Sequence, residues 1–575
     1  MAEMAESGTG KRLFVRQSSG LVRDVSVTNA LFFNIAAFVG VGLTLYPAFY
    51  SLAFVPVWRF GPFSEYGWAA IITGIFCVIL ALIFASLTSV MPRSGGDYVF
   101  TTRIVGPFLG WLESWTLVIA SIAIMAFEVP LVLRNIQITG RIIGIGAGGH
   151  FFKNANNWFT NSSGEITGWN GLIWSLVVLA VILGIVLLPT RRFHKVVTIM
   201  AGIGVASFVL MFVFGLLATH PSDFQHNLPK YTNGVTADQI AKSGSAILPG
   251  HTNDFLGDLF SRTVFPFMLG IVFLQFIGFQ YSAYISGEVR GNVKRGISIA
   301  LLGALLVGVI ANSIYVDLFS NHIGFNTTTA WGYNYWGGVT NIALPLGQPP
   351  SMPLVAVIAN KTLWPLWALI SLAGAMFPLL LCPVYVNFIS RMGLAWSLDR
   401  QLPEWFGEVN ERMAAPLNAI LATIGLCALF LWWQNFAVLP KSIAPPDGKL
   451  NLVATLWFSI FMAALTWIMP GVNAILIRFR RPDLIRNAPY KRWLWLLGIG
   501  WLVFPLWIYW FAAVKPIYDN LTNSGSGRLD YLNNSGITGS LVFTAAGLVI
   551  WGIMKIVQRS KGVDTSMLFA EIPPD

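Results

Sequence analysis

Charged residues are scarce in this chain, and so are cysteine and histidine. Of 575 residues, only 11% are Asp, Glu, Lys or Arg, and there are 3 cysteines and 6 histidines. A soluble globular domain carries about 25% charged residues, whereas 55% of this chain is hydrophobic. The composition therefore excludes an ordinary soluble domain and indicates a protein that lies in a lipid bilayer.

Sequence patterns of common enzymes and metal sites are also missing. The chain has no Walker motif and no HExxH, GxSxG or CxxC pattern. Its cysteines all fall in apolar segments, which argues against a disulfide framework or a metal site. No polar segment is long enough to form a catalytic domain. A net charge of +11 is spread over many loops, which argues against nucleic-acid binding. We therefore expect no enzymatic activity, no metal and no nucleic-acid partner.

Apolar segments of bilayer length are what the sequence has in abundance. A helix that crosses a bilayer needs about 20 apolar residues. Segments close to this length have approximate cores at 27–50, 66–90, 107–138, 169–189, 195–219, 263–287, 296–318, 362–390, 417–436, 452–477, 493–514 and 538–558. The predicted fold is an all-α polytopic membrane protein with about 12 transmembrane helices. The predicted parts are a tail over 1–26, a transmembrane domain over 27–558 and a tail over 559–575.

The distribution of basic residues predicts the orientation. An even number of spans puts both termini on one side, and that side collects about two thirds of the 36 Lys and Arg residues. Asn-x-Ser/Thr sequons all fall in loops that this orientation places outside, and they give the glycosylation candidates Asn161, Asn326, Asn360, Asn520 and Asn533. The first 26 residues are polar and basic, and show no cleavable signal. We expect a multi-pass plasma-membrane protein with both termini in the cytoplasm.

Two of the apolar segments contain residues that interrupt helices. They are residues 34–47, with Gly40, Gly42 and Pro47, and residues 273–287, with Gly278 and Gly287. Broken helices in corresponding positions of two halves point to the binding site of a transporter, because a break exposes backbone groups to a ligand. The alternative is that these are packing glycines at helix crossings.

The segments that join the helices carry further motifs. They are Pro92-Arg-Ser-Gly-Gly-Asp-Tyr98, Gly106-Pro-Phe-Leu-Gly110, Gly287-Glu-Val289 and the stretch from Ser390 to Pro403. Together with the two broken segments, they resemble the amino acid permeases of the amino acid–polyamine–organocation superfamily over about residues 25–495. The resemblance implies two inverted five-helix repeats, with helices 1–5 over about 27–219 and helices 6–10 over about 263–477. Helices 1 and 6 are expected to be broken, and two further helices are expected over about 493–558.

The resemblance also implies a secondary active transporter that moves amino acids by alternating access. A substrate carboxylate fits the positive end of a half-helix, and its amine fits unwound carbonyls. The implied substrate-binding residues are Phe38, Gly40, Val41, Gly42, Glu128, Leu274, Phe276, Ile277, Gly278, Phe279 and Gln280. The implied gating residues at the cytoplasmic hinges are Arg93, Gly95, Gly96, Glu288, Arg391 and Asp399.

Acidic residues inside apolar segments are functional candidates, because a charge in lipid is costly. Glu128 falls where the third helix of the family borders the substrate. It is a candidate partner for an amine or a cationic side chain, or a proton carrier. The alternatives are an ion pair with Arg134 and a protonated glutamic acid in a polar contact within the bundle. Glu113 lies closer to the cytoplasm, and we expect it to pair with a hinge arginine.

Departures from the family pattern leave the coupling ion open. The family often has Gly-Phe-Glu in helix 6, but Gln280 stands here and cannot carry a proton. Residues 196–219 contain no lysine to replace a sodium ion, and residues 376–383 show no Ser/Thr pair to bind one. A proton is slightly favoured over sodium, and no other cofactor is expected. The expected partners are an amino acid substrate and the lipid bilayer, and no obligate protein partner is evident. The alternative functions are a polyamine or other organic-cation transporter and, more remotely, a polytopic membrane enzyme.

Overall fold

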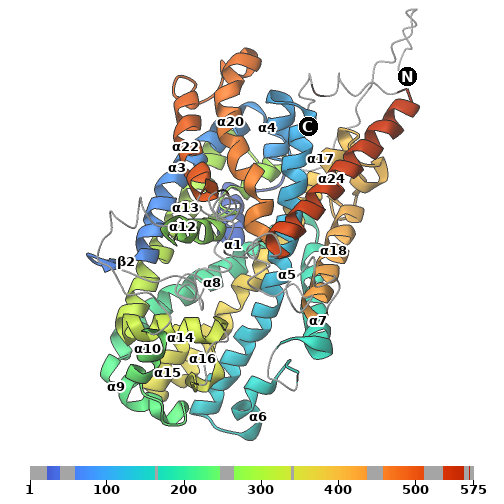
Figure 1. Ribbon diagram of the computed structural model, residues 1–575. Helices are drawn as coiled ribbons and strands as arrows, with labels where there is room; N and C mark the ends of the chain where they lie inside the picture. The colour runs from blue at the N-terminus through green and yellow to red at the C-terminus, as the bar shows by residue number, and fades with distance from the viewer. Residues whose placement is uncertain are drawn as a thin grey trace, which may run out of the picture.

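Helices make up nearly all of the regular structure in the computed structural model (Figure 1). The structure describes residues 23–38, 59–161, 166–245, 264–337, 342–436, 458–510 and 535–562, together with Val514 and Phe569. Within these residues, 9 helices are long and apolar enough to cross a membrane. The prediction of an all-α polytopic membrane protein is confirmed.

The described helices of the first part of the chain alternate long apolar segments with short connectors. They are α1 (Val27–Phe38), α3 (Glu65–Val90), α4 (Asp97–Ile104), α5 (Pro107–Gly146), α6 (His150–Lys153), α7 (Gly168–Val186), α8 (Thr190–Ala218), α9 (Pro221–Asn227) and α10 (Ala237–Ser245). Short 3₁₀ turns are η1 (Ala155–Asn157) and η2 (Leu228–Tyr231). Strands β1 (Arg59–Phe60) and β2 (Phe63–Ser64) form an antiparallel ribbon before α3.

The second part begins with a short apolar helix that is followed by a 3₁₀ segment. Its described helices are α12 (Val264–Phe276), α13 (Val293–Ile323), α14 (Phe325–Gly337), α15 (Met352–Ala359), α16 (Trp364–Gly374), α17 (Met376–Leu398), α18 (Leu417–Asn435), α20 (Ala464–Arg480), α21 (Pro482–Ile485), α22 (Leu494–Tyr509) and α24 (Ser535–Ser560). The 3₁₀ segments are η3 (Tyr281–Glu288), η4 (Pro345–Gly347), η5 (Lys361–Leu363) and η6 (Glu404–Gly407). Strands β3 (Val409–Asn410) and β4 (Ala415–Pro416) pair before α18.

Proline explains two of the helix boundaries. The predicted span at 362–390 is divided into α16 and α17, because Pro378 has no N–H to bond to the carbonyl of Gly374 one turn earlier. Pro107 opens α5 in the first turn, where a missing N–H costs no hydrogen bond. The predicted third span at 107–138 therefore begins where expected, and the helix continues to Gly146.

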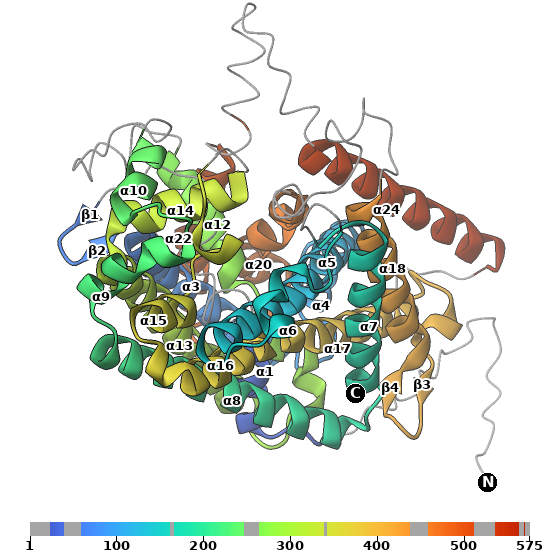
Figure 2. The same cartoon turned by 90° about the horizontal axis from the view of Figure 1, so that it is seen from below.

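Helix α5 lies inside the bundle and α24 lies along its edge (Figure 2). The most apolar part of α5 is 100% buried within the protein, whereas that of α24 is only 11% buried. With 40 residues, α5 is about 60 Å long. A helix that is covered on every side should be apolar all round, so the polar residues on α5 stand out as functional candidates.

Different helices close the two ends of the bundle (Figure 1). One end lies at α4 and at the end of α17, and we name it the charged end because two ion pairs are buried there. The opposite end lies beyond the end of α5, and we name it the capped end because the short helices α9, α10, α14 and α15 cover it. The Pro-rich stretch before α15 is irregular apart from η4, as its prolines predict.

Candidate functional site

The predicted interruption of the sixth span is present. Helix α12 ends at Phe276, residues 277–280 form a turn, and η3 follows from Tyr281. Gly278 has a φ of 113°, which side-chain-bearing residues rarely adopt. A Cβ atom at Gly278 would lie 2.9 Å from the backbone carbonyl of Ala37 on α1. Only glycine fits here, and the broken part of helix 6 therefore lies directly against α1.

Most of the residues predicted on helix 6 are buried around this turn. Phe276 and Phe279 are fully buried, and Leu274, Ile277 and Gln280 are nearly so. The Gln280 side chain accepts a hydrogen bond from the Gly278 backbone N–H at 3.1 Å. In the described structure this side chain therefore stabilises the turn itself, a task for which glutamine and glutamate both have a suitable acceptor oxygen.

The first span is described only up to Phe38 in α1, without the side chain of that residue. Gly40, Val41 and Gly42, which are predicted to bind the substrate carboxylate, lie outside the described residues. The described part of α1 is held against η3 by Asn34, which donates to Ser282 Oγ at 2.9 Å and accepts from the Ser282 N–H at 2.7 Å. Main-chain bonds of 2.9 Å also link the Val25 N–H to the Glu288 carbonyl and the Arg290 N–H to the Val25 carbonyl. Helices 1 and 6 are thus joined side by side.

Glu128 lies on α5, is fully buried, and faces α17 close to Cys382 and Tyr385. Among the described residues, neither of its carboxylate oxygens has a hydrogen-bond partner. The alternative of an ion pair with Arg134 is wrong, because Arg134 donates to Gln137 Oε1 at 2.7 Å and lies over the Tyr335 ring. A buried carboxyl without a partner needs either a proton or a cationic ligand.

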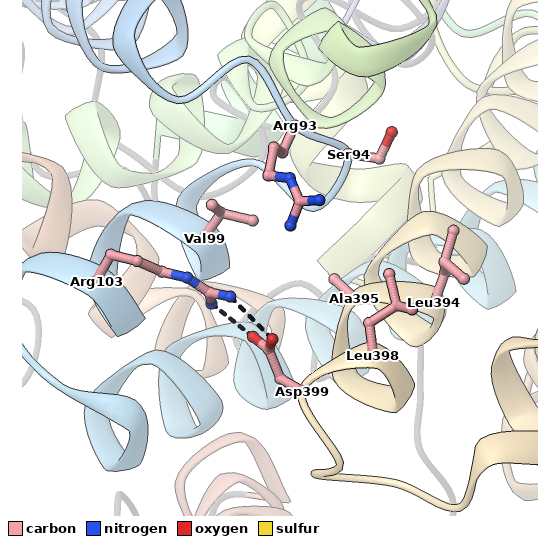
Figure 3. Close-up of a pocket in the computed structure, with 8 residues that line it drawn as sticks. All are labelled: Arg93, Ser94, Val99, Arg103, Leu394, Ala395, Leu398 and Asp399. Carbon is pink, nitrogen blue, oxygen red and sulfur yellow. Dashed lines mark hydrogen bonds and ion pairs between the residues drawn. The ribbon is translucent and has the colours of Figure 1, made fainter. Parts of the chain in front are cut away.

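Two buried ion pairs hold the charged end together. Arg391 on α17 binds Glu288 at the end of η3 through two bonds, Nε to Oε1 at 2.8 Å and Nη2 to Oε2 at 3.1 Å. Arg103 on α4 binds Asp399 at the end of α17 in the same way, with Nη1 to Oδ2 at 2.5 Å and Nη2 to Oδ1 at 2.8 Å (Figure 3). Each side chain is at most 3% exposed. The pairs therefore tie η3 and α4 to the same helix, α17.

The predicted hinge residues meet at this end. The Gly95 N–H donates to the Tyr284 carbonyl at 3.0 Å, and Ser286 Oγ donates to the Arg93 carbonyl at 3.1 Å. Gly96 has a φ of 53°, and a Cβ atom there would lie 2.6 Å from the Tyr284 ring. The segment between α3 and α4 is thus fitted closely against η3.

A small pocket opens between α17 and the segment that joins α3 to α4 (Figure 3). Its cavity volume is only about 20 Å³. Arg93, Ser94 and Val99 line one side, and Leu394, Ala395 and Leu398 line the other. The Arg103–Asp399 pair closes the pocket at one edge, and the ring of Phe569 lies 5.4 Å from the guanidinium carbon of Arg103.

Comparison with known proteins identifies the family of this chain. Residues 26–525 match the family model of the amino acid permeases. The chain belongs to the amino acid permease family. It is therefore a multi-pass membrane permease and not an enzyme, and the resemblance seen in its motifs is confirmed.

Individual relatives of this permease are distant. The branched-chain amino acid permease BcaP of Lactococcus lactis subsp. cremoris (strain MG1363) is 23% identical over 68% of this chain and 73% of its own length. The aspartate-proton symporter of Bacillus subtilis (strain 168) is 22% identical over 80% of this chain and 74% of its own length. The methylthioribose transporter of the same bacterium is 22% identical over 87% of this chain and 94% of its own length. These relatives are named for different substrates, so membership of the family does not identify the substrate of this chain.

The permease also contains an acid pair that sequence reasoning missed. We expected Glu113 to pair with a hinge arginine, but neither of its carboxylate oxygens has a hydrogen-bond partner among the described residues. Its carboxyl group lies near Asp97 and Thr101 instead. Arg103 and Arg391 are already bound to other carboxylates, so neither is left to pair with Glu113. Burial raises the pKa of Asp97, which lies on α4 between the spanning helices. The signal in the sequence was the acid within Gly-Gly-Asp-Tyr, directly after the hinge glycines.

The sequons that fall within the described residues lie at the capped end. Asn326 and Asn360 are exposed, and Asn161 is half-buried with its Nδ2 bonded to Thr167 Oγ1 at 2.9 Å. Asn520 and Asn533 lie outside the described residues. Glycosylation of these asparagines stays a prediction.

Proposed function

We propose that this permease moves an amino acid across the plasma membrane by alternating access, with the substrate held where helices 1 and 6 are interrupted. The observation that supports this most is the turn at residues 277–280, which separates α12 from η3 and lies against α1. A break of this kind at mid-membrane depth is tolerated where it lines a cavity. The substrate carboxylate would bind the backbone of Gly40, Val41 and Gly42, and the amine would face carbonyls of Phe38, Leu274 and Ile277.

The charged end would face the cytoplasm and the capped end the outside. The excess of Lys and Arg in the loops of the charged end supports this orientation. The exposure of Asn326 and Asn360 at the capped end agrees with it, since glycosylation requires an exported, accessible loop. Both termini would then be cytoplasmic, and the Arg391–Glu288 and Arg103–Asp399 pairs would belong to the inner gate. Opening the inner gate would require these pairs to separate.

A second candidate, an organic cation or polyamine as substrate, is favoured by one observation. The buried Glu128 carboxyl has no hydrogen-bond partner among the described residues, and a cationic ligand would supply one. The two candidates differ in what Glu128→Gln should do. If the substrate is a polyamine, the variant should lose all transport. If it is a neutral amino acid, transport should persist with a changed pH dependence.

Counterflow in proteoliposomes tests the function directly. The purified full chain is reconstituted, loaded with each of the twenty amino acids or putrescine, and supplied with the labelled compound outside. We expect uptake of at least one amino acid. Gly278→Ala should abolish it, because its Cβ atom would press on the Ala37 carbonyl. Gly184→Ala is the matched control, since nothing lies within 4 Å of the added atom. No counterflow with any amino acid would overturn the proposal.

A further inference from the structure

The last helix, α24, is fixed to the interior of the bundle although little of it is buried. The Trp111 indole N–H donates to the Gly547 carbonyl at 2.9 Å, and the Trp115 indole N–H donates to the Phe543 carbonyl at 2.8 Å. Both tryptophans belong to α5, the central helix of the bundle. These bonds hold α24 along α5, so the chain that follows α24 starts from a fixed point.

The end of α24 meets the end of α17 at the charged end. Gln558, which is only 7% exposed, donates from Nε2 to the Arg400 carbonyl at 3.4 Å. Arg400 directly follows Asp399, which accepts both hydrogen bonds of the buried ion pair with Arg103. The C-terminal tail, predicted over 559–575, therefore begins next to an ion pair that closes this end of the bundle.

Phe569, in this tail, lies on the same ion pair. Its ring is placed over Arg103, with the centroid 5.4 Å from the guanidinium carbon, and the residue is only 7% exposed. Asp399 occupies Nη1 and Nη2 of Arg103, whereas Nε has no hydrogen-bond partner among the described residues. An aromatic ring in this position attracts the positive charge and occupies space from which water would otherwise reach the pair.

The contact has an energetic consequence for the ion pair. Two opposite charges attract each other more strongly where water is kept away, because the effective dielectric constant is lower there. Phe569 is the only aromatic residue in the tail, so it is the one tail side chain that can form a cation–π contact. It follows the last transmembrane helix, and it can therefore leave Arg103 without unfolding any of the helices that cross the membrane.

We propose that the C-terminal tail is a latch on the inner gate, in which Phe569 stabilises the Arg103–Asp399 pair and has to leave Arg103 before α4 and α17 separate. The inference rests on the proposed function in one respect, that the charged end is the inner gate. Phe569 acts through Arg103, so it is a positioning residue. Release of Phe569 lets water reach the ion pair, which weakens the pair and favours the open gate. The tail thereby controls how readily the gate opens.

Thiol accessibility measures the opening of the gate without any substrate. Val99 is 3% exposed and lines the pocket at the charged end, one turn before Arg103 on α4. A cysteine at this position is therefore protected while α4 and α17 stay together. The full chain with Val99→Cys, and with its 3 native cysteines replaced by alanine, is placed in lipid nanodiscs. A membrane-impermeant maleimide is added, and the rate of modification is followed by mass spectrometry.

Loss of the aromatic ring should speed this modification. We expect Phe569→Ala to raise the rate by about two- to thirtyfold, which corresponds to the loss of one cation–π contact. Phe569→Tyr keeps a ring over Arg103 and should leave the rate close to that of the parent protein. Phe479→Ala is the matched control, because it removes the same atoms from a ring that is 74% exposed at the end of α20.

A combination with the ion pair separates a latch from simple packing. In Arg103→Met with Asp399→Leu there is no charge for the ring to stabilise. Addition of Phe569→Ala to this double variant should therefore change the modification rate by less than about twofold, since the effects of coupled residues are not additive. An increase as large as in the protein with the intact ion pair would overturn the proposal, because Phe569 would then act by packing alone.

The remaining outcomes also decide the question. Equal modification rates with Phe569 and with Phe569→Ala would overturn the latch. If the protein without native cysteines fails to fold, counterflow by the otherwise unchanged chain replaces the assay. Phe569→Ala should then exchange substrate faster than Phe479→Ala, and an equal or slower rate would overturn the latch. Because thiol modification needs no substrate, absence of amino acid counterflow by the wild-type protein would overturn the proposed function without deciding the latch.

Discussion

The charged end and the capped end of this permease are closed by different chemistry. At the charged end, Arg391–Glu288 and Arg103–Asp399 are buried ion pairs. At the capped end, two of the cross-links are hydrogen bonds between neutral groups. Gln348 donates to Asn156 Oδ1 at 2.7 Å, and Trp331 donates to the Gln348 carbonyl at 2.8 Å. Removal of one partner leaves a bare buried charge at one end but only an unpaired amide at the other. The charged end should therefore be far more sensitive to single substitutions.

The largest effect should come from Asp399→Asn. It leaves the Arg103 guanidinium buried without a counter-charge, and we expect a loss of about 3–5 kcal/mol in the free energy of unfolding. Replacing both partners with apolar residues, as in Arg103→Met with Asp399→Leu, should cost much less, because no charge is stranded. Thermal unfolding of the purified variants in detergent measures both. A double variant as unstable as the single one would contradict this reading of the charged end.

A smaller effect is expected for Asn34→Ala, between the two ends. The substitution removes both hydrogen bonds to Ser282 and leaves a buried N–H without its acceptor. We expect a loss of about 1–3 kcal/mol, measured by the same unfolding assay. Thr28→Ala, at an exposed position of the same helix, is the control and should change little. Equal stability of Asn34→Ala and Thr28→Ala would show that the Asn34 bonds contribute nothing.

At the capped end, Gln348→Ala should cost about 0.5–1.5 kcal/mol. It removes the bond to Asn156 but keeps the backbone carbonyl that accepts from Trp331. The ranking of Gln348→Ala below Asp399→Asn is the sharpest test of the comparison. If Gln348→Ala is the more destabilising of the two, the distinction between ionic and neutral closure fails.

The smallest effect is expected where a charge pair is exposed. Arg481 Nη2 lies 2.8 Å from Asp483 Oδ2, but Asp483 is 58% exposed. The hydrogen bond from Arg481 lowers the pKa of Asp483 in the folded protein. The pair therefore stabilises the fold above the unfolded pKa, and this contribution is lost as the pH falls through the lower folded value. Because water screens the pair, Asp483→Asn should cost less than about 0.5 kcal/mol at neutral pH. Unfolding of both proteins across acid pH should show this small difference disappear.

Local patterns explain why much of the fold could be predicted. The span predicted at 66–90 is α3, which runs from Glu65 to Val90, because hydropathy over about 20 residues is a local property. Gly278 marked the break in helix 6 because the conformation needed there favours glycine. Short helices such as α10 and α14 lie outside the predicted spans, since each is stabilised by the other and not by a long apolar segment. Thr327 Oγ1 donates to the Ala237 carbonyl, and Asn334 donates to Ser243 Oγ.

The side-chain partners in the candidate site were less predictable. The sequence indicated that Glu113 and the predicted hinge arginines belong to the same end of the molecule. It did not indicate which acidic residue pairs with which arginine. Asp399 is 296 positions from Arg103, and Glu288 is 103 positions from Arg391. Several carboxylates could have satisfied each arginine, and only the packing of α4, η3 and α17 decides among them.

The main-chain bonds at Val25 add a consequence for mutagenesis. Val25 lies in the stem that leads into α1, and its amide and carbonyl bond to the carbonyl of Glu288 and the amide of Arg290. Side-chain replacements leave such main-chain bonds in place, so an alanine scan would not detect their contribution. The stem and the end of η3 would therefore move together. Arg290→Pro, which removes the amide hydrogen that bonds to the Val25 carbonyl, is the substitution that would separate them.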